Sequence, residues 1–128
     1  ISEGTSKEGR MVVTKEDLAS SFGSGGLPVL ATPIMILLIE RTAVECLMPL
    51  LKEGESTVGI SVDVRHTAPS VVGSEVSCKV EVEEVDRSRI VFKIRVWDSA
   101  GEVGSGKHER FIVNDSKFME KAASGVKT

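Results

Sequence analysis

The segment from Leu30 to Leu51, LATPIMILLIERTAVECLMPLL, constrains the fold most strongly because it is almost entirely apolar. Thr32 followed by Pro33 is typical of a helix start, since a threonine hydroxyl can cap free N–H groups and an early proline removes no needed donor. Pro49 predicts that the helix ends or kinks near Met48. A helix that is apolar on nearly every side is predicted to be buried. It is too short and too charged in its middle to span a membrane, which takes about 20 apolar residues.

Two polar residues occupy positions where the pattern predicts burial. Glu40 lies in the middle of the apolar helix. His66 lies in a segment where apolar and polar residues alternate strictly, as in a strand with one buried face. The buried face of that segment is predicted to carry Val58, Ile60, Val62, Val64, His66 and Ala68.

The rest of the chain downstream of the helix reads as strands. Alternation continues over residues 74–85, 89–98 and 102–114, and a short strand is expected at 10–14, ahead of a mobile, glycine-rich loop at 15–26. Short connections between successive strands favour antiparallel pairing. The predicted fold class is therefore α+β, with an antiparallel sheet of about five strands wrapped around one long buried helix.

Composition limits the class of protein. A chain of 128 residues with 41% hydrophobic residues is expected to form one domain, here residues 10–128, after a disordered segment at 1–9. A net charge of −3 gives no electrostatic reason to expect nucleic acid. Cys46 and Cys78 lie in apolar segments and are predicted to be buried free thiols of a reducing compartment. No signal peptide or lipidation motif is visible, so a cytoplasmic location is expected.

The helix also predicts an oligomer. One five-stranded sheet cannot cover a helix that is apolar almost all round, and a second copy of the chain is the simplest additional cover. We therefore expect a homo-oligomer.

Glu40 and His66 are expected to contact each other, since a carboxylate and an imidazole can satisfy one another in apolar surroundings. A buried pair of this kind is often only structural, so the pattern alone leaves its function open. Thr32 is separated from Glu40 by about 12 Å along the helix axis. Either His66 lies between them, or the site combines groups from two chains.

Two other kinds of site are not expected. Residues 101–108, GEVGSGKH, fall one residue short of a phosphate-binding loop, and they lack both the Ser or Thr after Lys107 and a following helix. His108, which takes that place, is interpreted as a surface or structural residue. Two separated histidines and two lone cysteines form no recognised metal-ligand spacing, so no metal is predicted.

The order of strand, loop, buried helix and four antiparallel strands resembles the hotdog fold of acyl-CoA thioesterases and dehydratases. Over residues 28–118 the sequence resembles the fluoroacetyl-CoA thioesterase family more narrowly. The residues that carry this resemblance are Ala31-Thr32, Glu40, His66-Thr67-Ala68 and the GSGKHER of residues 104–110.

The resemblance implies hydrolysis of a small acyl-CoA thioester to the free acid and coenzyme A. It implies a catalytic set of Thr32, Glu40 and His66, with Gly59 and Arg110 in contact with substrate. His66 would be the general base, and Thr32 would be either the nucleophile or the group that orients water. The start of the helix would stabilise the oxyanion, and Arg110 would meet the phosphates of coenzyme A. The implied state is a homodimer that uses no cofactor beyond the coenzyme A of its substrate.

One stretch departs from the family. The fluoroacetyl-specific enzyme has a longer, aromatic-containing lid ahead of the helix, whereas this chain has SFGSGGLPVL at residues 21–30, with Phe22 as its only aromatic residue. An acyl group other than fluoroacetyl is therefore expected. Two alternatives remain: a non-catalytic acyl-CoA-binding or ligand-sensing module, and an acyl-CoA hydratase or dehydratase, whose Asp-and-His motif is not found here.

Overall fold

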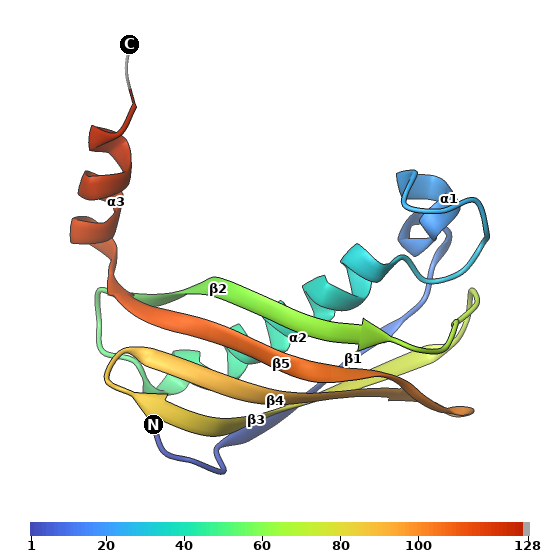
Figure 1. Ribbon diagram of the computed structural model, residues 1–128, viewed down its shortest axis with the longest axis horizontal. Coiled ribbons are helices and arrows are strands. Elements are labelled where there is room, and N and C mark those ends of the chain that lie inside the picture. The colour runs from blue at the N-terminus through green and yellow to red at the C-terminus, as the bar shows by residue number, and fades with distance from the viewer. Residues whose placement is uncertain (127–128) are drawn as a thin grey trace.

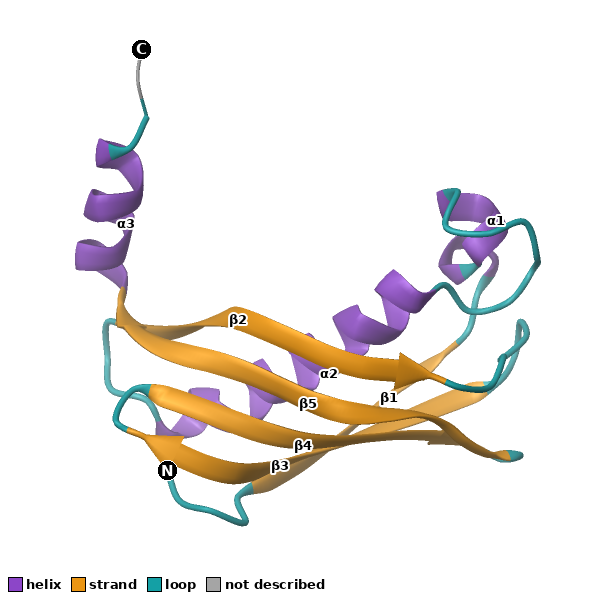
Figure 2. Cartoon of the chain, viewed as in Figure 1, coloured by secondary structure: helices purple, strands orange, loops and turns teal. Residues whose placement is uncertain are grey.

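The computed structural model describes residues 1–126, which form one five-stranded antiparallel sheet with a long helix against one face (Figure 1). The sheet order is β1-β3-β4-β5-β2. Its strands are β1 (Ser6–Val12), β2 (Glu55–His66), β3 (Glu75–Asp86), β4 (Arg89–Asp98) and β5 (Gly101–Asn114). The helices are α1 (Ala19–Phe22), the long α2 (Thr32–Leu47) and α3 (Asp115–Ser124), with 3-10 turns at Lys15–Asp17 and Met48–Leu50. Figure 2 shows α2 crossing behind the sheet, as the α+β prediction required.

Both ends of α2 lie close to their predicted positions. The helix ends at Leu47 and tightens into a 3-10 turn that contains Pro49. At the other end Ala31 is the capping residue, and Thr32 is the first helical residue without a side-chain capping bond. The prediction that Thr32 caps the helix is therefore wrong, and its hydroxyl is available for another partner.

The sheet covers only one face of α2. Met35, Leu38 and Leu47 are fully buried, whereas Leu37 is 52% exposed. Burial on nearly every side is therefore not reached within residues 1–126, because the sheet lies against one face of α2 and leaves Leu37 outside.

The core lies mainly between α2 and the neighbouring strands β3 and β4. Alternate residues of these strands point into it, as predicted: Val76, Cys78, Val80, Val82, Ile90, Phe92, Ile94 and Val96. Cys46 and Cys78 are buried free thiols, and burial raises the pKa of Cys78 to about 12. Both cysteines thus behave as apolar core residues.

The predicted alternation along β2 is wrong in its first half. The register with β5 shifts between Gly59 and Ser61, so that Ile60 forms a β-bulge and is 51% exposed. One extra residue reverses the faces of the strand, because side chains alternate with a period of two. Gly59 therefore faces the helix, where the sequence predicted Ile60, while His66 keeps its predicted face.

The N-terminus is more ordered than expected. β1 begins at Ser6, and residues 6–9 pair with β3, with Gly9 opposite Cys78. The expectation of disorder over residues 1–9 therefore does not hold for 6–9. Strand pairing uses backbone groups, which polar side chains do not prevent. The predicted loop at 15–26 contains the first 3-10 turn and α1.

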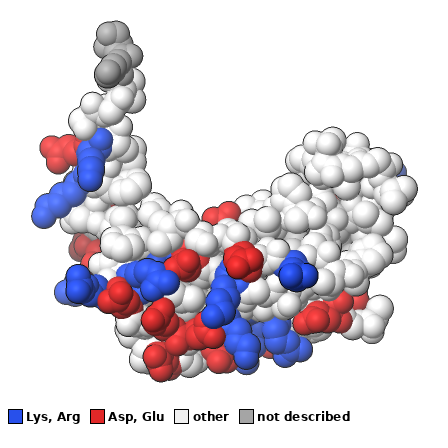
Figure 3. Space-filling model, viewed as in Figure 1, with Lys and Arg blue, Asp and Glu red and all other residues white. Residues whose placement is uncertain are grey.

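α3 follows β5 directly and was not predicted. The Asn114 side chain accepts a hydrogen bond from the Lys117 N–H and caps the helix, which projects away from the sheet (Figure 1). Charged side chains gather over the sheet, whereas the lobe containing α1 is nearly free of them in the view of Figure 3. Within residues 1–126, no helix has the length and apolar character needed to cross a membrane.

Candidate active site

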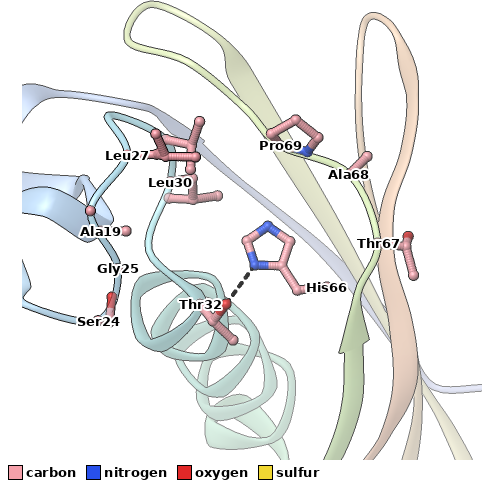
Figure 4. A pocket seen from close by; sticks show the side chains of 12 residues that line it. Ala19, Ser24, Gly25, Leu27, Leu30, Thr32, His66, Thr67, Ala68 and Pro69 are labelled. Carbon is pink, nitrogen blue, oxygen red and sulfur yellow. Dashed lines mark hydrogen bonds between the residues drawn. The ribbon is translucent and has the colours of Figure 1, made fainter.

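Thr32 and His66 meet where the start of α2 lies beside the end of β2. Thr32 Oγ1 and His66 Nδ1 are 2.8 Å apart (Figure 4). The contact is possible because Thr32 is not used as a cap and because His66 keeps its inward face after the bulge. The resemblance placed both residues in one site, and the structure brings them together.

The other ring nitrogen of His66 has no hydrogen-bond partner among the described residues. Nε2 is buried, and the pKa of His66 lies below its usual value mainly because burial disfavours the charged ring, with a smaller opposite effect from the Ala68 backbone. If Thr32 donates its hydroxyl proton to Nδ1, the ring proton of the neutral imidazole is on Nε2. That N–H then lacks the acceptor which a buried donor requires.

A cavity of about 360 Å³ borders the Thr32–His66 pair. Its other lining residues come from α1, from the loop before α2 and from the segment after β2: Ala19, Ser24, Gly25, Gly26, Leu27, Val29, Leu30, Thr67, Ala68 and Pro69. Figure 4 shows the His66 ring between Thr32 on one side and Leu30 and Pro69 on the other. The pair is therefore placed to act on a molecule bound in a mainly apolar space.

The start of α2 offers fewer free donors than a helix usually does. Pro33 has no N–H, and the N–H groups of Ile34 and Met35 both bond to the Ala31 carbonyl, at 3.0 and 3.1 Å. Among the described residues, the Thr32 N–H has no such partner. One N–H and the positive end of the helix dipole thus remain beside the pair.

Glu40 does not contact His66, and the prediction that they form a pair is wrong. Its Oε2 instead lies 3.4 Å from Arg110 Nη1. Along α2, Glu40 is about 12 Å from Thr32, to which His66 is bonded, so one chain cannot close this distance. Its side chain remains 40% exposed.

Arg110 is the centre of a second polar cluster under β2 and β5. Its Nε and Nη2 donate to the hydroxyl and carbonyl oxygens of Thr57 at 2.9 and 3.0 Å, and it is only 5% exposed. The sequence suggested that Arg110 meets the phosphates of coenzyme A. It is poorly placed to do so, because its guanidinium is buried and bonded within the chain. Its geometry instead holds Glu40 in position.

His108 completes this cluster and is fully buried, so the surface interpretation is wrong and the structural one is correct. Its Nδ1 lies 2.8 Å from the Ser61 carbonyl oxygen and its Nε2 lies 3.2 Å from Arg110 Nη1. Nδ1 must donate and Nε2 must accept, so the ring is neutral, in line with a pKa lowered chiefly by burial. The sequence indicated this cluster through the two-residue spacing between His108 and Arg110, because that spacing puts both side chains on the same face of a strand.

Gly59 lies directly over the cluster. A Cβ at this position would meet Glu40 Oε2 at 2.8 Å and Arg110 Nη1 at 3.3 Å. The space above Glu40 thus stays open because residue 59 has no side chain. Gly59 and Arg110, which the resemblance paired as substrate contacts, are opposite one another in the register of β2 and β5.

Comparisons with known proteins agree with this arrangement. A sequence profile described as fluoroacetyl-CoA-specific thioesterase matches residues 13–116. The chain belongs to this thioesterase family. The fluoroacetyl-CoA thioesterase of Streptantibioticus cattleyicolor is 34% identical over 93 residues, which cover 73% of this chain and 67% of that protein.

Solved structures place the thioesterase in the hotdog fold. A fluoroacetyl-CoA thioesterase with threonine replaced by serine, in complex with acetyl-CoA, matches with a TM-score of 0.92 and 26% identity, over 99% of this chain and 100% of that one. A hot-dog-like protein from Thermanaerovibrio acidaminovorans matches with a TM-score of 0.91 and 25% identity, over 98% and 93% of the two chains. The fold and family predicted from the sequence are confirmed.

The remaining motifs of this thioesterase have structural explanations. Residues 101–114 form strand β5, so the GEVGSGKH segment is not a phosphate loop followed by a helix. Gly104 lies opposite His66, where a Cβ would press on the Arg65 carbonyl and on Met35. The absence of a side chain at Gly104 lets β5 approach β2 closely beside the site. Among residues 1–126, no group of three or more His, Cys, Asp or Glu side chains is placed to hold a metal ion.

Proposed function

We propose that this thioesterase hydrolyses a small acyl-CoA to the free acid and coenzyme A, with Thr32 and His66 as the reacting pair. The observation that supports this most directly is the 2.8 Å contact between Thr32 Oγ1 and His66 Nδ1 at the edge of a cavity. A hydroxyl and a neutral imidazole in hydrogen-bond contact are the minimum needed for base-assisted attack on a thioester carbonyl.

His66 acts as the general base. Its lowered pKa keeps the imidazole neutral and able to accept a proton near neutral pH. The proton comes either from the Thr32 hydroxyl, which then attacks the carbonyl carbon, or from a water that Thr32 orients. In both routes the tetrahedral intermediate collapses with loss of the coenzyme A thiolate, which takes the proton from His66. In the first route a water molecule then hydrolyses the acyl-Thr32 ester.

The oxyanion of the intermediate forms at the start of α2. The Thr32 N–H and the helix dipole supply positive charge there, and both are fixed before reaction begins. The connection between Leu30 and Thr32 therefore does more than lead into α2, because it also positions the N–H that binds the oxyanion.

Glu40 of a second copy is proposed as the third catalytic group. The Nε2–H of His66 needs an acceptor, and the Glu40 of its own chain lies about 12 Å along α2 from Thr32, to which His66 is bonded. A homodimer that brings the half-exposed Glu40 of each chain to the His66 of the other would satisfy both groups. Exposed apolar residues along α2 and the edge strand β2, such as Leu37, Ile60 and Val62, support this interface.

Arg110 and Gly59 support Glu40 in this scheme. Arg110 holds the carboxylate, and Gly59 leaves the space above it open to the acyl thioester. Both would thus reach the substrate from the second copy.

Release of free thiol from a panel of acyl-CoAs tests the reaction. We expect turnover by the wild type, and losses of about 100-fold or more in kcat/KM for Thr32→Ala, Glu40→Gln and His66→Ala with acyl-CoA binding retained. Tight binding without thiol release by the wild type would contradict the proposal and favour a binding or sensing module. Mass spectrometry of the quenched enzyme separates the two routes, because only one leaves an acyl group on Thr32.

Mixing two inactive variants tests the shared site. In a mixed dimer of Thr32→Ala and Glu40→Gln chains, one of the two sites keeps every catalytic group. Random exchange should therefore restore about a quarter of the wild-type activity, since half of the dimers are mixed and each has one intact site. No recovery, with subunit exchange verified by differently tagged chains, would place all three groups in one chain.

A further inference from the structure

We propose that Gly26, in the glycine-rich segment ahead of α2 (residues 21–30, the lid), leaves room in the cavity for an uncharged acyl chain longer than acetyl, of about four to six carbons. This inference rests on the proposed thioesterase function and names its substrate class. It is carried by the size of the cavity, by its lining and by the backbone of the lid.

The cavity is larger than a two-carbon acyl group requires. Its volume is about 360 Å³. A methylene group occupies roughly the same space as a water molecule, about 30 Å³. A chain of four to six carbons takes about 120 to 180 Å³ of this space. It fits beside Thr32 and His66 and leaves room for the thioester and for solvent near the mouth.

The lining of the cavity selects the kind of chain. Leu27, Leu30 and Pro69 present apolar surface, and among the described residues none that lines the cavity carries a formal charge. Burying the carboxylate of a dicarboxylic acyl group against these residues would cost free energy, because none of them carries a compensating positive charge. A saturated hydrocarbon chain gains from the same surroundings.

Two neighbouring glycines of the lid border the cavity. A Cβ on Gly26 would meet nothing within 4 Å, so a side chain at this lining position has open space to enter. A Cβ on Gly25 would lie 3.3 Å from the Cβ of Ala19, against α1. Neither residue has a positive φ, whereas Gly23 has a φ of 70°. Side chains can therefore be added at position 26 without straining the backbone.

The test compares kcat/KM for acetyl-, butyryl-, hexanoyl-, octanoyl- and succinyl-CoA in the wild type, Gly26→Ala and Gly26→Val. For the wild type we expect about a four-fold gain for each methylene up to butyryl or hexanoyl, the factor that corresponds to burying one CH₂. Succinyl-CoA should be the poorest substrate of its length. Gly26→Val should lower hexanoyl turnover by about ten-fold or more and change acetyl turnover by less than about three-fold, because the added methyl groups fill the space of the distal carbons.

Gly23→Ala is the matched control, since it strains the lid backbone without filling the cavity. This variant should lower kcat/KM by similar factors for acyl-CoAs of every chain length. Acetyl-CoA as the best substrate of the wild type, or an equal loss for all chains in Gly26→Val, would overturn the inference and leave the thioesterase function intact. Absence of thiol release from every acyl-CoA would instead overturn the proposed function itself, and this inference with it.

Discussion

The two histidines of this thioesterase both have a pKa lowered by burial, yet their surroundings differ in the property that matters for proton transfer. His108 uses both ring nitrogens, one toward the Ser61 carbonyl and one toward Arg110. His66 uses one nitrogen toward Thr32, and its other has no partner among residues 1–126. A saturated imidazole can only hold its neighbours in place, whereas an imidazole with unused capacity beside a cavity can exchange a proton.

The difference follows from where the two residues lie in the sheet. His108 lies within β5, which has a strand on each side, and its ring stacks on Phe92 with centroids 6.3 Å apart. His66 is the last residue of edge strand β2, next to the lid and the start of α2. Strand interiors are packed on all sides, and strand ends open onto loops, where binding sites concentrate.

The largest expected effect comes from removing His66, the histidine proposed as the general base. His66→Ala should lower kcat/KM by about 1,000-fold, the loss typical of a general base, and should change the free energy of unfolding by less than about 1 kcal/mol. Thiol release and urea unfolding measure the two quantities. An activity loss explained by unfolding alone would show that His66 is structural, like His108.

The saturated histidine should behave in the opposite way. His108→Ala removes one acceptor of Arg110 Nη1 and the side-chain donor to the Ser61 carbonyl, and should cost about 3 kcal/mol of stability. His108→Gln, whose side-chain oxygen can accept from Arg110, should recover part of this loss, as chemical denaturation would show. If the two variants are equally unstable, the bond to Arg110 contributes nothing measurable.

A smaller effect is expected from adding one methyl group over the second cluster. Gly59→Ala should force the Glu40 carboxylate to move, because the new Cβ would lie 2.8 Å from its Oε2. We expect a loss of about 1 kcal/mol in stability and about ten-fold in kcat/KM, since the flexible end of Glu40 can shift but not without misplacing the carboxylate. Gly125→Ala, at the end of α3, is a control that should change neither quantity.

The smallest effect concerns pH and involves both histidines together. Burial lowers the pKa of each below the usual 6.5, so below that pH the unfolded chain binds more protons than the folded one. Their contribution to stability is therefore complete above pH 6.5 and is lost as the pH falls from there toward the folded pKa values. The free energy of unfolding of the wild type and of His108→Gln, measured across this pH range, tests this contribution. An identical pH dependence in both proteins would show that His108 does not contribute to it.

Much of the fold could be predicted from the sequence because it depends on local periodicity. Spacing predicts the apolar segment around α2 and the inward faces of β3 and β4. Pro49 predicts that the helix ends shortly before it, as it does at Leu47. The bulge at Ile60 could not be predicted in this way, since a register shift depends on the partner strand and leaves the alternation of the sequence unbroken. The same holds for residues 6–9, whose pairing uses only backbone atoms.

The sequence by itself determined which residues are candidates for the site. Burial pattern or family resemblance singles out Thr32, Glu40, His66, Gly59 and Arg110. Only the tertiary structure decided how they are grouped, with Thr32 beside His66, and Glu40 beside Arg110 and His108. A pattern reports whether a side chain points inward, but not which other inward side chain it meets. Which residues meet depends on how α2 is placed against the sheet, and so on which residue of α2 lies beside which residue of β2. That placement is a relation between elements in space and cannot be read from spacing along the chain.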